Sequence, residues 1–304
     1  MSSTIGFIGV GNMGLPMIRN LIKAGHGIKA FDISAEALEA AKEAGATIAS
    51  AIADAATDTN AVITMLPQGQ HVREAYLGTG EGNPGILSAA SSTAILIDCS
   101  TVDIESAKAV AERAEREKRS MVDAPVSGGI SGAAAGTLTF MVGGTKENFE
   151  RARPILEAMG RNIVHIGGSG LGQAMKICNN MMAGIALTGT AEAVSLGQAL
   201  GIDPKTLHQV MSTSSGQNWM MDTMYPVEGV VESAASNRGF APGFRASLMA
   251  KDLGLAQAAA QTTGTGTPLG ALTASLYRTL CLQGGGELDC SAIYRLLHGD
   301  SMKP

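Results

Sequence analysis

One lysine stands out because of the residues around it. Lys176 lies in the segment GLGQAMKICNN, residues 170–180, among Ala, Met, Ile and Cys. Asn180 follows four residues later, which places both side chains on one face of a helix. A lysine kept from water has a lowered pKa and can act as a base, with Asn180 orienting it or holding a substrate oxygen. The alternative is a lysine that snorkels to solvent, and the pattern leaves both open.

A second group of residues has the spacing of a phosphate-binding loop. An apolar run over residues 4–10 leads into a G-x-G-x-x-G sequence, and a helical stretch over 15–24 follows it. Such glycines permit a tight turn, a close approach to a pyrophosphate and close packing of helix on strand. The helix N-terminus then offers N–H groups and partial positive charge to phosphates. The loop residues expected to contact a dinucleotide are Gly9, Gly11, Asn12, Met13 and Gly14.

An acid completes this pattern. A strand predicted over residues 27–31 ends at Asp32, and no Arg follows within several residues. A carboxylate here accepts hydrogen bonds from the ribose hydroxyls and repels a 2′-phosphate, so the expected cofactor is NAD rather than NADP. Because strand, loop, helix and acid occur in order, dinucleotide binding is favoured over a purely structural turn.

Two further segments have side chains or backbone groups suited to a ligand. Ser127, Gly128 and Gly129 offer a hydroxyl and adjacent N–H groups that suit a carboxylate, although the same residues also fit a plain turn. Lys251 and Asp252 form a charged pair at the start of an apolar helical stretch. That pair fits either a solvated turn or a contact with the cofactor.

Composition excludes several other classes of protein. The 304 residues are 45% hydrophobic with a formal net charge of −5 and no basic run, so we expect no nucleic acid partner. The four cysteines lack metal-site spacing, and we expect no metal. The apolar stretch over 181–202 contains Glu192 and Gln198 and predicts a buried helix rather than a membrane span. With a strand already at residue 4, we expect no leader segment and a cytoplasmic protein.

The order of elements predicts the fold. Strands and helices alternate to about residue 166, which indicates a Rossmann-like, doubly wound and mostly parallel α/β sheet. From residue 172 onward nearly every segment reads as helix, with an irregular stretch over 216–243. We therefore expect a dinucleotide-binding domain over 1–164 and an all-helical domain for substrate binding and oligomerisation over 165–304, joined by a long helix.

Five longer segments carry a resemblance to a known family. They are FIGVGNMGLPM at 7–17, TMLP at 64–67, DCST at 98–101, DAPVSGGISGAAAGTLTFMVGG at 123–144 and GQAMKICNN at 172–180. Together they resemble the β-hydroxyacid dehydrogenase family over nearly the whole chain. The segments at 214–230 and 244–256 resemble the members that act on 3-hydroxyisobutyrate more than the tartronate semialdehyde reductases, which usually have Asn-Arg in place of Phe31-Asp32.

The resemblance implies an activity and assigns residues to it. It implies NAD-dependent oxidation of 3-hydroxyisobutyrate to methylmalonate semialdehyde in valine breakdown, with Lys176 as general acid/base and Asn180 assisting. Ser127, Gly128 and Gly129 would hold the substrate carboxylate, and the pocket wall would lie near Trp219. The implied NAD contacts beyond the glycine loop are Leu66, Pro67, His71, Thr101, Lys251 and Asp252, with His71 standing where many relatives have Asn.

Other readings remain open at this point. The reaction can belong to a related β-hydroxyacid dehydrogenase or to a semialdehyde reductase of the tartronate or succinic type, because the carboxylate anchor is shared. A non-catalytic dinucleotide-binding protein is a third possibility. Small residues over 175–200 allow close helix packing, and we expect a homodimer or homotetramer.

Overall fold

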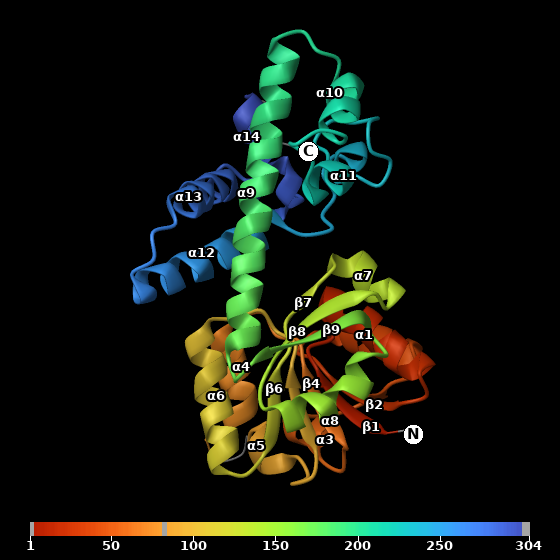
Figure 1. The fold of residues 1–304 in the computed structure, drawn as a ribbon. Helices are drawn as coiled ribbons and strands as arrows, with labels where there is room; N and C mark the ends of the chain where they lie inside the picture. The colour runs from red at the N-terminus through yellow and green to blue at the C-terminus, as the bar shows by residue number, and fades with distance from the viewer. Residues whose placement is uncertain (1–2, 81–83, 300–304) are drawn as a thin grey trace. The chain divides into compact units, whose positions relative to one another are not determined.

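The chain divides into two compact units, Met1–Lys176 and Ile177–Pro304 (Figure 1). The structure, a computed structural model, describes residues 3–80 and 84–299. Strand β9, Gly160–Gly167, and the first residues of helix α9, Leu171–Ala199, belong to the first unit. The expected division after residue 164 remains a prediction about where the two functions separate.

The first unit is built on one nine-stranded sheet with the order β3-β2-β1-β4-β5-β6-β8-β7, and β9 pairs with β8. All pairings are parallel except those of β8 with β6 and β7. This confirms the doubly wound, mostly parallel sheet. The other strands are β1 Thr4–Ile8, β2 Gly27–Phe31, β3 Thr47–Ile48, β4 Ala61–Thr64, β5 Ile95–Asp98, β6 Ser120–Asp123, β7 Val126–Ser127 and β8 Leu138–Gly143.

Helices cover both faces of this sheet (Figure 1). Along β4, Ile63 packs into the cluster with α1 and α8, whereas Val62 packs into the cluster with α3, α4 and α6. Successive strand residues point to opposite faces, so a strand covered on both faces reads as a continuous apolar run. The helices are α1 Gly11–Lys23, α2 Ala35–Glu43, α3 Ile52–Ala56, α4 Gly69–Leu77, α5 Ile86–Ala89, α6 Ile104–Arg116, α7 Gly129–Ala135 and α8 Lys146–Leu156.

Several local elements differ from the sequence-based expectation. The helix after the glycine loop begins at Gly11 rather than residue 15, so the loop forms the first turn of α1. The sequence pattern predicts one strand over 121–126, but the structure has two, β6 and β7, and β7 pairs antiparallel with β8. Helices α3, α4, α5 and α7 were not anticipated. They are four to nine residues long, too short for a clear helical period to show in the sequence.

The second unit is helical, as expected, and packs around the middle of α9. Its core includes Leu187 and Val194 of α9, Leu253 of α12 and Tyr277 of α13. The segment expected to be irregular holds a short helix, α11, and a 3₁₀ turn, η1. The elements are α10 Pro204–Met211, α11 Trp219–Thr223, η1 Ala235–Arg238, α12 Ala246–Thr263, α13 Pro268–Leu282, η2 Gly285–Glu287, η3 Cys290–Ala292 and α14 Ile293–His298.

Small residues of α9 bring neighbouring helices of this unit close. A Cβ on Gly184 would lie 3.2 Å from Leu253 of α12, and one on Gly197 would lie 2.6 Å from Leu207 of α10. Part of the small-residue pattern therefore serves packing inside the chain. None of the helices within residues 3–80 and 84–299 has the length and apolar character needed to cross a membrane.

Candidate functional site

The glycine loop has the geometry that a dinucleotide requires. Gly9 has φ of +92°, and a Cβ there would lie 2.2 Å from the carbonyl oxygen of Met65. A Cβ on Gly14 would lie 2.2 Å from the carbonyl oxygen of Gly9 and 2.9 Å from the Phe7 ring, so α1 packs directly on β1. A Cβ on Gly11, by contrast, would have none of the described atoms within 4 Å. This surface lets a pyrophosphate reach the start of α1, where no side chain caps the helix.

Asp32 lies at the end of β2 and closes the other side of the loop. Its Oδ2 accepts hydrogen bonds from the backbone N–H of Val10 at 2.7 Å and of Gly11 at 3.3 Å. Its Oδ1 accepts from Ser34 at 2.8 Å. The structure thus brings the acid and the glycines together, as the fingerprint predicts. The residues present fit NAD: an open glycine turn for the pyrophosphate and a half-exposed carboxylate beside it for a ribose.

The ends of β4 and β5 are joined by Ser100. Its hydroxyl accepts a hydrogen bond from the N–H of Leu66 at 2.8 Å, and its own N–H donates to Asp98 Oδ1 at 3.1 Å. Thr64 also donates to Asp98 Oδ1, at 2.7 Å. The expected cofactor contacts Leu66, Pro67 and Thr101 therefore lie on two strand exits held in fixed register.

Burial governs the protonation of Asp98. The side chain is 1% exposed, and Oδ2 has no hydrogen-bond partner among the residues that the structure describes. Desolvation raises the pKa of Asp98 to about 6, hydrogen bonds from Ser100 and Thr64 oppose the shift, and the neighbouring carboxylate of Asp123 adds to it. The two acids are opposite each other in the register of β5 and β6. Asp98 therefore takes up a proton far more readily than an exposed aspartate does.

Asp123 spans from the sheet to the first turn of α9. Its Oδ1 accepts from the N–H of Gly170 at 2.7 Å, and its Oδ2 accepts from the N–H of Gln173 at 3.0 Å. Burial raises the pKa of Asp123 while these backbone donors act in the opposite direction. Gln173 in turn donates to the carbonyl of Ser100 at 2.7 Å and accepts from the N–H of Val102 at 3.1 Å.

Lys176 follows on α9, three residues after Gln173, and is 7% exposed. In the second unit Asn180 is 6% exposed and donates to Asp252 Oδ2 at 2.5 Å. Asp252, 2% exposed, has its Oδ1 3.3 Å from the Lys251 ammonium. The structure thus groups three of the expected residues, Asn180, Lys251 and Asp252, in one set of contacts.

The other expected residues lie on different elements. Ser127 ends β7 and is half-buried, and Gly128 and Gly129 both have positive φ, +134° and +63°. A Cβ on Gly129 would meet nothing within 4 Å, so this turn opens to solvent or ligand. Trp219 begins α11 and is 61% exposed, and His71 is exposed on the first turn of α4. The roles assigned to these residues remain predictions.

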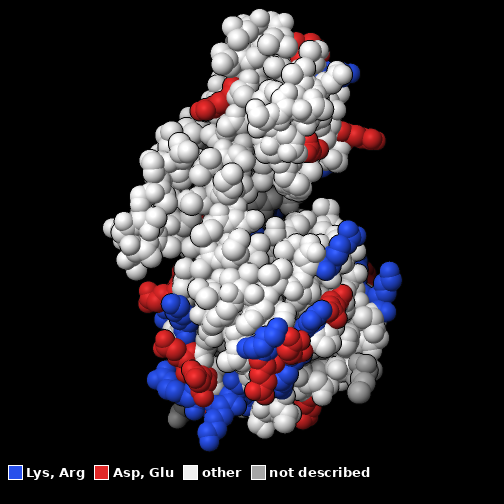
Figure 2. All heavy atoms as spheres, viewed as in Figure 1, with Lys and Arg blue, Asp and Glu red and all other residues white. Residues whose placement is uncertain are grey.

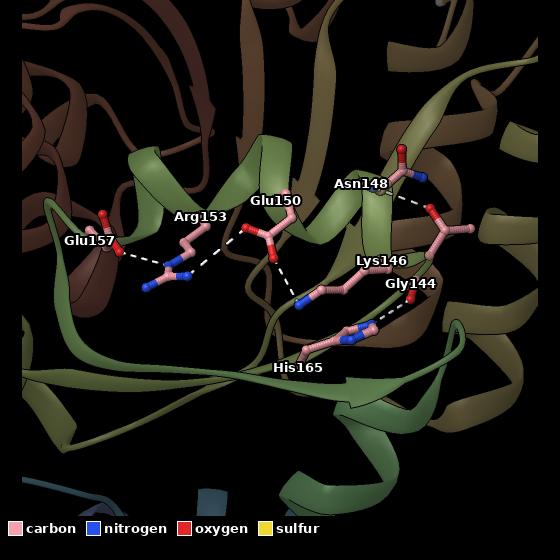
Figure 3. Close-up of polar contacts among 8 residues, drawn as sticks. Gly144, Lys146, Asn148, Glu150, Arg153, Glu157 and His165 are labelled. Carbon is pink, nitrogen blue, oxygen red and sulfur yellow. Dashed lines mark hydrogen bonds and ion pairs between the residues drawn. The ribbon is translucent and has the colours of Figure 1, made fainter.

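Charged side chains on α8 and the nearby imidazole of His165 contact one another or the backbone on the surface of the first unit. Figure 3 shows Lys146, Glu150, Arg153 and Glu157 linked along one exposed helix face, with distances of 2.8 to 3.9 Å. His165 Nε2 lies 2.8 Å from the Gly144 carbonyl, and its ring stacks on Phe149. Such exposed ion pairs contribute little to stability, and this helix face is open to solvent.

Cysteine and metal chemistry receive no support from the described residues. All four cysteines are free: Cys99 and Cys290 are buried, Cys281 is half-buried and Cys178 is exposed. Across residues 3–80 and 84–299 no group of three His, Cys, Asp or Glu side chains is placed to hold a metal ion.

Sequence reasoning missed Asp123 and Gln173, which carry the contacts between β6, the exit of β5 and α9. The partners of Asp123 are 47 and 50 residues away in sequence, so no local pattern links them and only the folded chain joins them.

Two family models match successive parts of the chain. Residues 4–167 match the family described as the NAD binding domain of 6-phosphogluconate dehydrogenase, and residues 170–297 match the NAD-binding family of NADP-dependent 3-hydroxyisobutyrate dehydrogenase. A Pseudomonas aeruginosa 3-hydroxyisobutyrate dehydrogenase is 48% identical, with 97% of this chain and 98% of that one aligned. An NAD-dependent L-serine dehydrogenase of the same organism is 47% identical, over 96% and 97%.

A solved structure is also similar. The Mycobacterium tuberculosis 3-hydroxyisobutyrate dehydrogenase with L-serine has a TM-score of 0.91 and 41% identity, covering 98% of this chain and 99% of that one. Fold, glycine loop and relatives together define an NAD-binding oxidoreductase. The chain belongs to the 3-hydroxyisobutyrate dehydrogenase family and is an NAD-dependent β-hydroxyacid dehydrogenase.

The buried carboxyl of Asp98 predicts a pH-dependent stability difference. Between about pH 4 and pH 6 the unfolded chain ionises this group while the folded chain keeps its proton, so its stabilising contribution is lost as pH rises. Asp98→Asn mimics the protonated form. Relative to the native sequence, its free energy of unfolding should therefore improve by about 3 kcal/mol from pH 4 to pH 8. Thermal unfolding of both proteins across this range measures the difference, and a constant difference would contradict the assignment.

Proposed function

We propose that the chain oxidises 3-hydroxyisobutyrate to methylmalonate semialdehyde with NAD, as a step in valine breakdown. The observation that carries the proposal is a lysine, Lys176, 7% exposed at the start of α9 in a chain of this family. A relative with this activity in its name is 48% identical. An ammonium this far from water is costly to bury unless it serves a purpose.

Residues of the first unit suggest how substrate is held and deprotonated. The hydroxyl of Ser127 and the N–H groups of the Gly128-Gly129 turn are suited to bind a carboxylate. Lys176, as the neutral amine, accepts the proton of the substrate hydroxyl. When bound, NAD would supply the acceptor for the hydride of the hydroxyl-bearing carbon, so that the alcohol becomes an aldehyde while Lys176 keeps the proton.

Residues of the second unit have supporting roles in this proposal. The Asn180 amide is held by Asp252 and by Asn179, which donates to Asn180 Oδ1 at 3.0 Å, so its orientation is fixed. We assign Asn180 to assist Lys176, one helical turn earlier on α9, and Trp219 to the pocket wall. We assign Lys251 and Asp252 to NAD binding, together with Leu66, Pro67, His71 and Thr101.

L-Serine is the second candidate substrate. A relative at 47% identity is named an NAD-dependent L-serine dehydrogenase, and the similar M. tuberculosis structure contains L-serine. Both candidates are propanoates with a hydroxyl on the β-carbon, and they differ in the methyl or ammonium group on the α-carbon. The same anchor and base therefore serve either one.

We also propose that copies of the chain associate in the cytoplasm. The helical unit shows few charges on the face in Figure 2, whereas the first unit shows both signs interspersed. Large apolar side chains are exposed on α9 and α13, among them Met182 at 65% and Leu282 at 88%. A partner copy would cover these side chains.

The substrate is tested by initial rates of NADH formation with 3-hydroxyisobutyrate, L-serine, glycerate and 4-hydroxybutyrate at alkaline pH, with NADP in parallel. We expect the highest kcat/KM with 3-hydroxyisobutyrate and NAD. A higher kcat/KM with L-serine would make L-serine the preferred substrate and leave the proposed mechanism unchanged. No turnover of any acid, with NAD still bound, would favour a non-catalytic dinucleotide-binding protein.

Lys176→Ala tests the base. Because general-base catalysis contributes about 10²- to 10⁴-fold, kcat should fall by at least that lower factor. Binding of NAD, followed by fluorescence titration, should stay within about two-fold. The control is Lys205→Ala on α10, an exposed lysine whose loss should leave kcat unchanged. Near-native turnover by Lys176→Ala would contradict the proposed mechanism.

Asp32→Ala tests how the cofactor is selected. Removing the carboxylate removes the repulsion of a 2′-phosphate, so kcat/KM with NADP relative to NAD should rise by about ten-fold or more. Asp32→Asn separates charge from hydrogen bonding, because its amide keeps the shape and lacks the charge. An unchanged cofactor ratio in both variants would show that Asp32 does not read the ribose.

A further inference from the structure

The first turn of α9 is tied to the sheet by two side chains outside the expected catalytic set. The opening N–H groups of any helix have no partner within the helix. Here Asp123, at the end of β6, accepts two of them, from Gly170 and Gln173. A carboxylate at this end also interacts favourably with the helix dipole. The cap of α9 is therefore supplied by the sheet and not by the residues just before the helix.

The backbone around the Asp123 carboxylate lies so close that added side chains at the neighbouring glycines would collide with it. A Cβ on Gly143 would lie 2.5 Å from Asp123 Oδ1. A Cβ on Gly172 would lie 2.4 Å from the Met141 carbonyl oxygen and 2.7 Å from Asp123 Oδ2. The carboxylate is 4% exposed, so water does not compete for its bonds. This packing fixes both the height and the tilt of the helix start against β6 and β8.

A second tie fixes the rotation of α9. The Gln173 amide, 0% exposed, bonds the carbonyl of Ser100 and the N–H of Val102. Ser100 is also the residue that joins the exits of β4 and β5. Residues three apart on a helix share a face, so fixing Gln173 fixes the direction in which Lys176 leaves the helix.

We propose that Asp123 and Gln173 are positioning residues for Lys176. They hold the first turn of α9 in one place on the sheet, so that the amine meets the substrate hydroxyl at a constant distance. The proposal rests on Lys176 being the base. A displacement of about 1 Å can cost 10²-fold in rate, so loss of either tie should act on the chemical step.

Two variants test the positions directly. In Asp123→Asn one oxygen still accepts an N–H, but the amide nitrogen cannot accept the other. In Gln173→Met the size is kept and both bonds are lost. We expect kcat to fall about ten-fold or more in each, with KM for NAD within about two-fold. The kinetic isotope effect on kcat with substrate deuterated at the hydride-donating carbon should rise, because chemistry becomes slower than product release.

The matched control is Asp203→Asn. Asp203 caps α10 by accepting from the Thr206 N–H at 3.0 Å and from its hydroxyl at 3.2 Å. Its loss should lower Tm while kcat and the isotope effect stay unchanged. A merely structural Asp123 or Gln173 would give this same result, so the isotope effect separates positioning from stability.

The outcomes distinguish this inference from the proposed function. If Lys176→Ala is inactive but Asp123→Asn and Gln173→Met keep the native kcat and isotope effect, the positioning role is wrong and the base assignment stands. If Lys176→Ala is active, the function itself fails, whatever the other variants do. If Asp123→Asn does not fold, Gln173→Met alone decides, since it leaves the cap in place.

Discussion

Two backbone N–H groups at the start of α9 donate to the carboxylate of Asp123, and these bonds hold the first turn of the helix on the sheet. The carboxylate reaches the helix because Gly143 and Gly172 have no side chains. Gln173 adds a second link to the exit of β5. A sheet edge that already carries the ends of β4, β5 and β6 thereby also sets where Lys176 lies.

Burial raises the free-energy cost of carrying charged side chains at this edge of the sheet. Asp98 and Asp123 lie opposite each other on adjacent strands, and desolvation raises the pKa of both. Hydrogen-bond donors oppose the shift at both: two N–H groups of the α9 start at Asp123, and Thr64 and Ser100 at Asp98. Both acids therefore take up protons more readily than exposed aspartates do, and protonation of either relieves the repulsion between them.

The family and the residues together narrow the chemistry to a hydroxyl on the β-carbon of a small acid. The first unit holds an open glycine turn, a carboxylate beside it and a buried lysine. The relatives divide between 3-hydroxyisobutyrate and L-serine, two acids that differ in the group on the α-carbon. The pocket wall that contacts this group decides the preference, and Trp219 is the residue we assign to it.

Local sequence patterns determined much of the fold of this protein. Apolar runs predicted the central strands, the glycine spacing predicted the turn before α1, and an acid after β2 predicted Asp32, since each depends on residues close in sequence. Sequence patterns did not predict short helices such as α7 or the separation of β7 from β6. These elements depend on contacts with segments that are distant in sequence. Only tertiary structure decided what holds α9, because Asp123 and Gln173 act on residues about 50 to 73 positions away, and hydrogen bonding over such separations has no local signature.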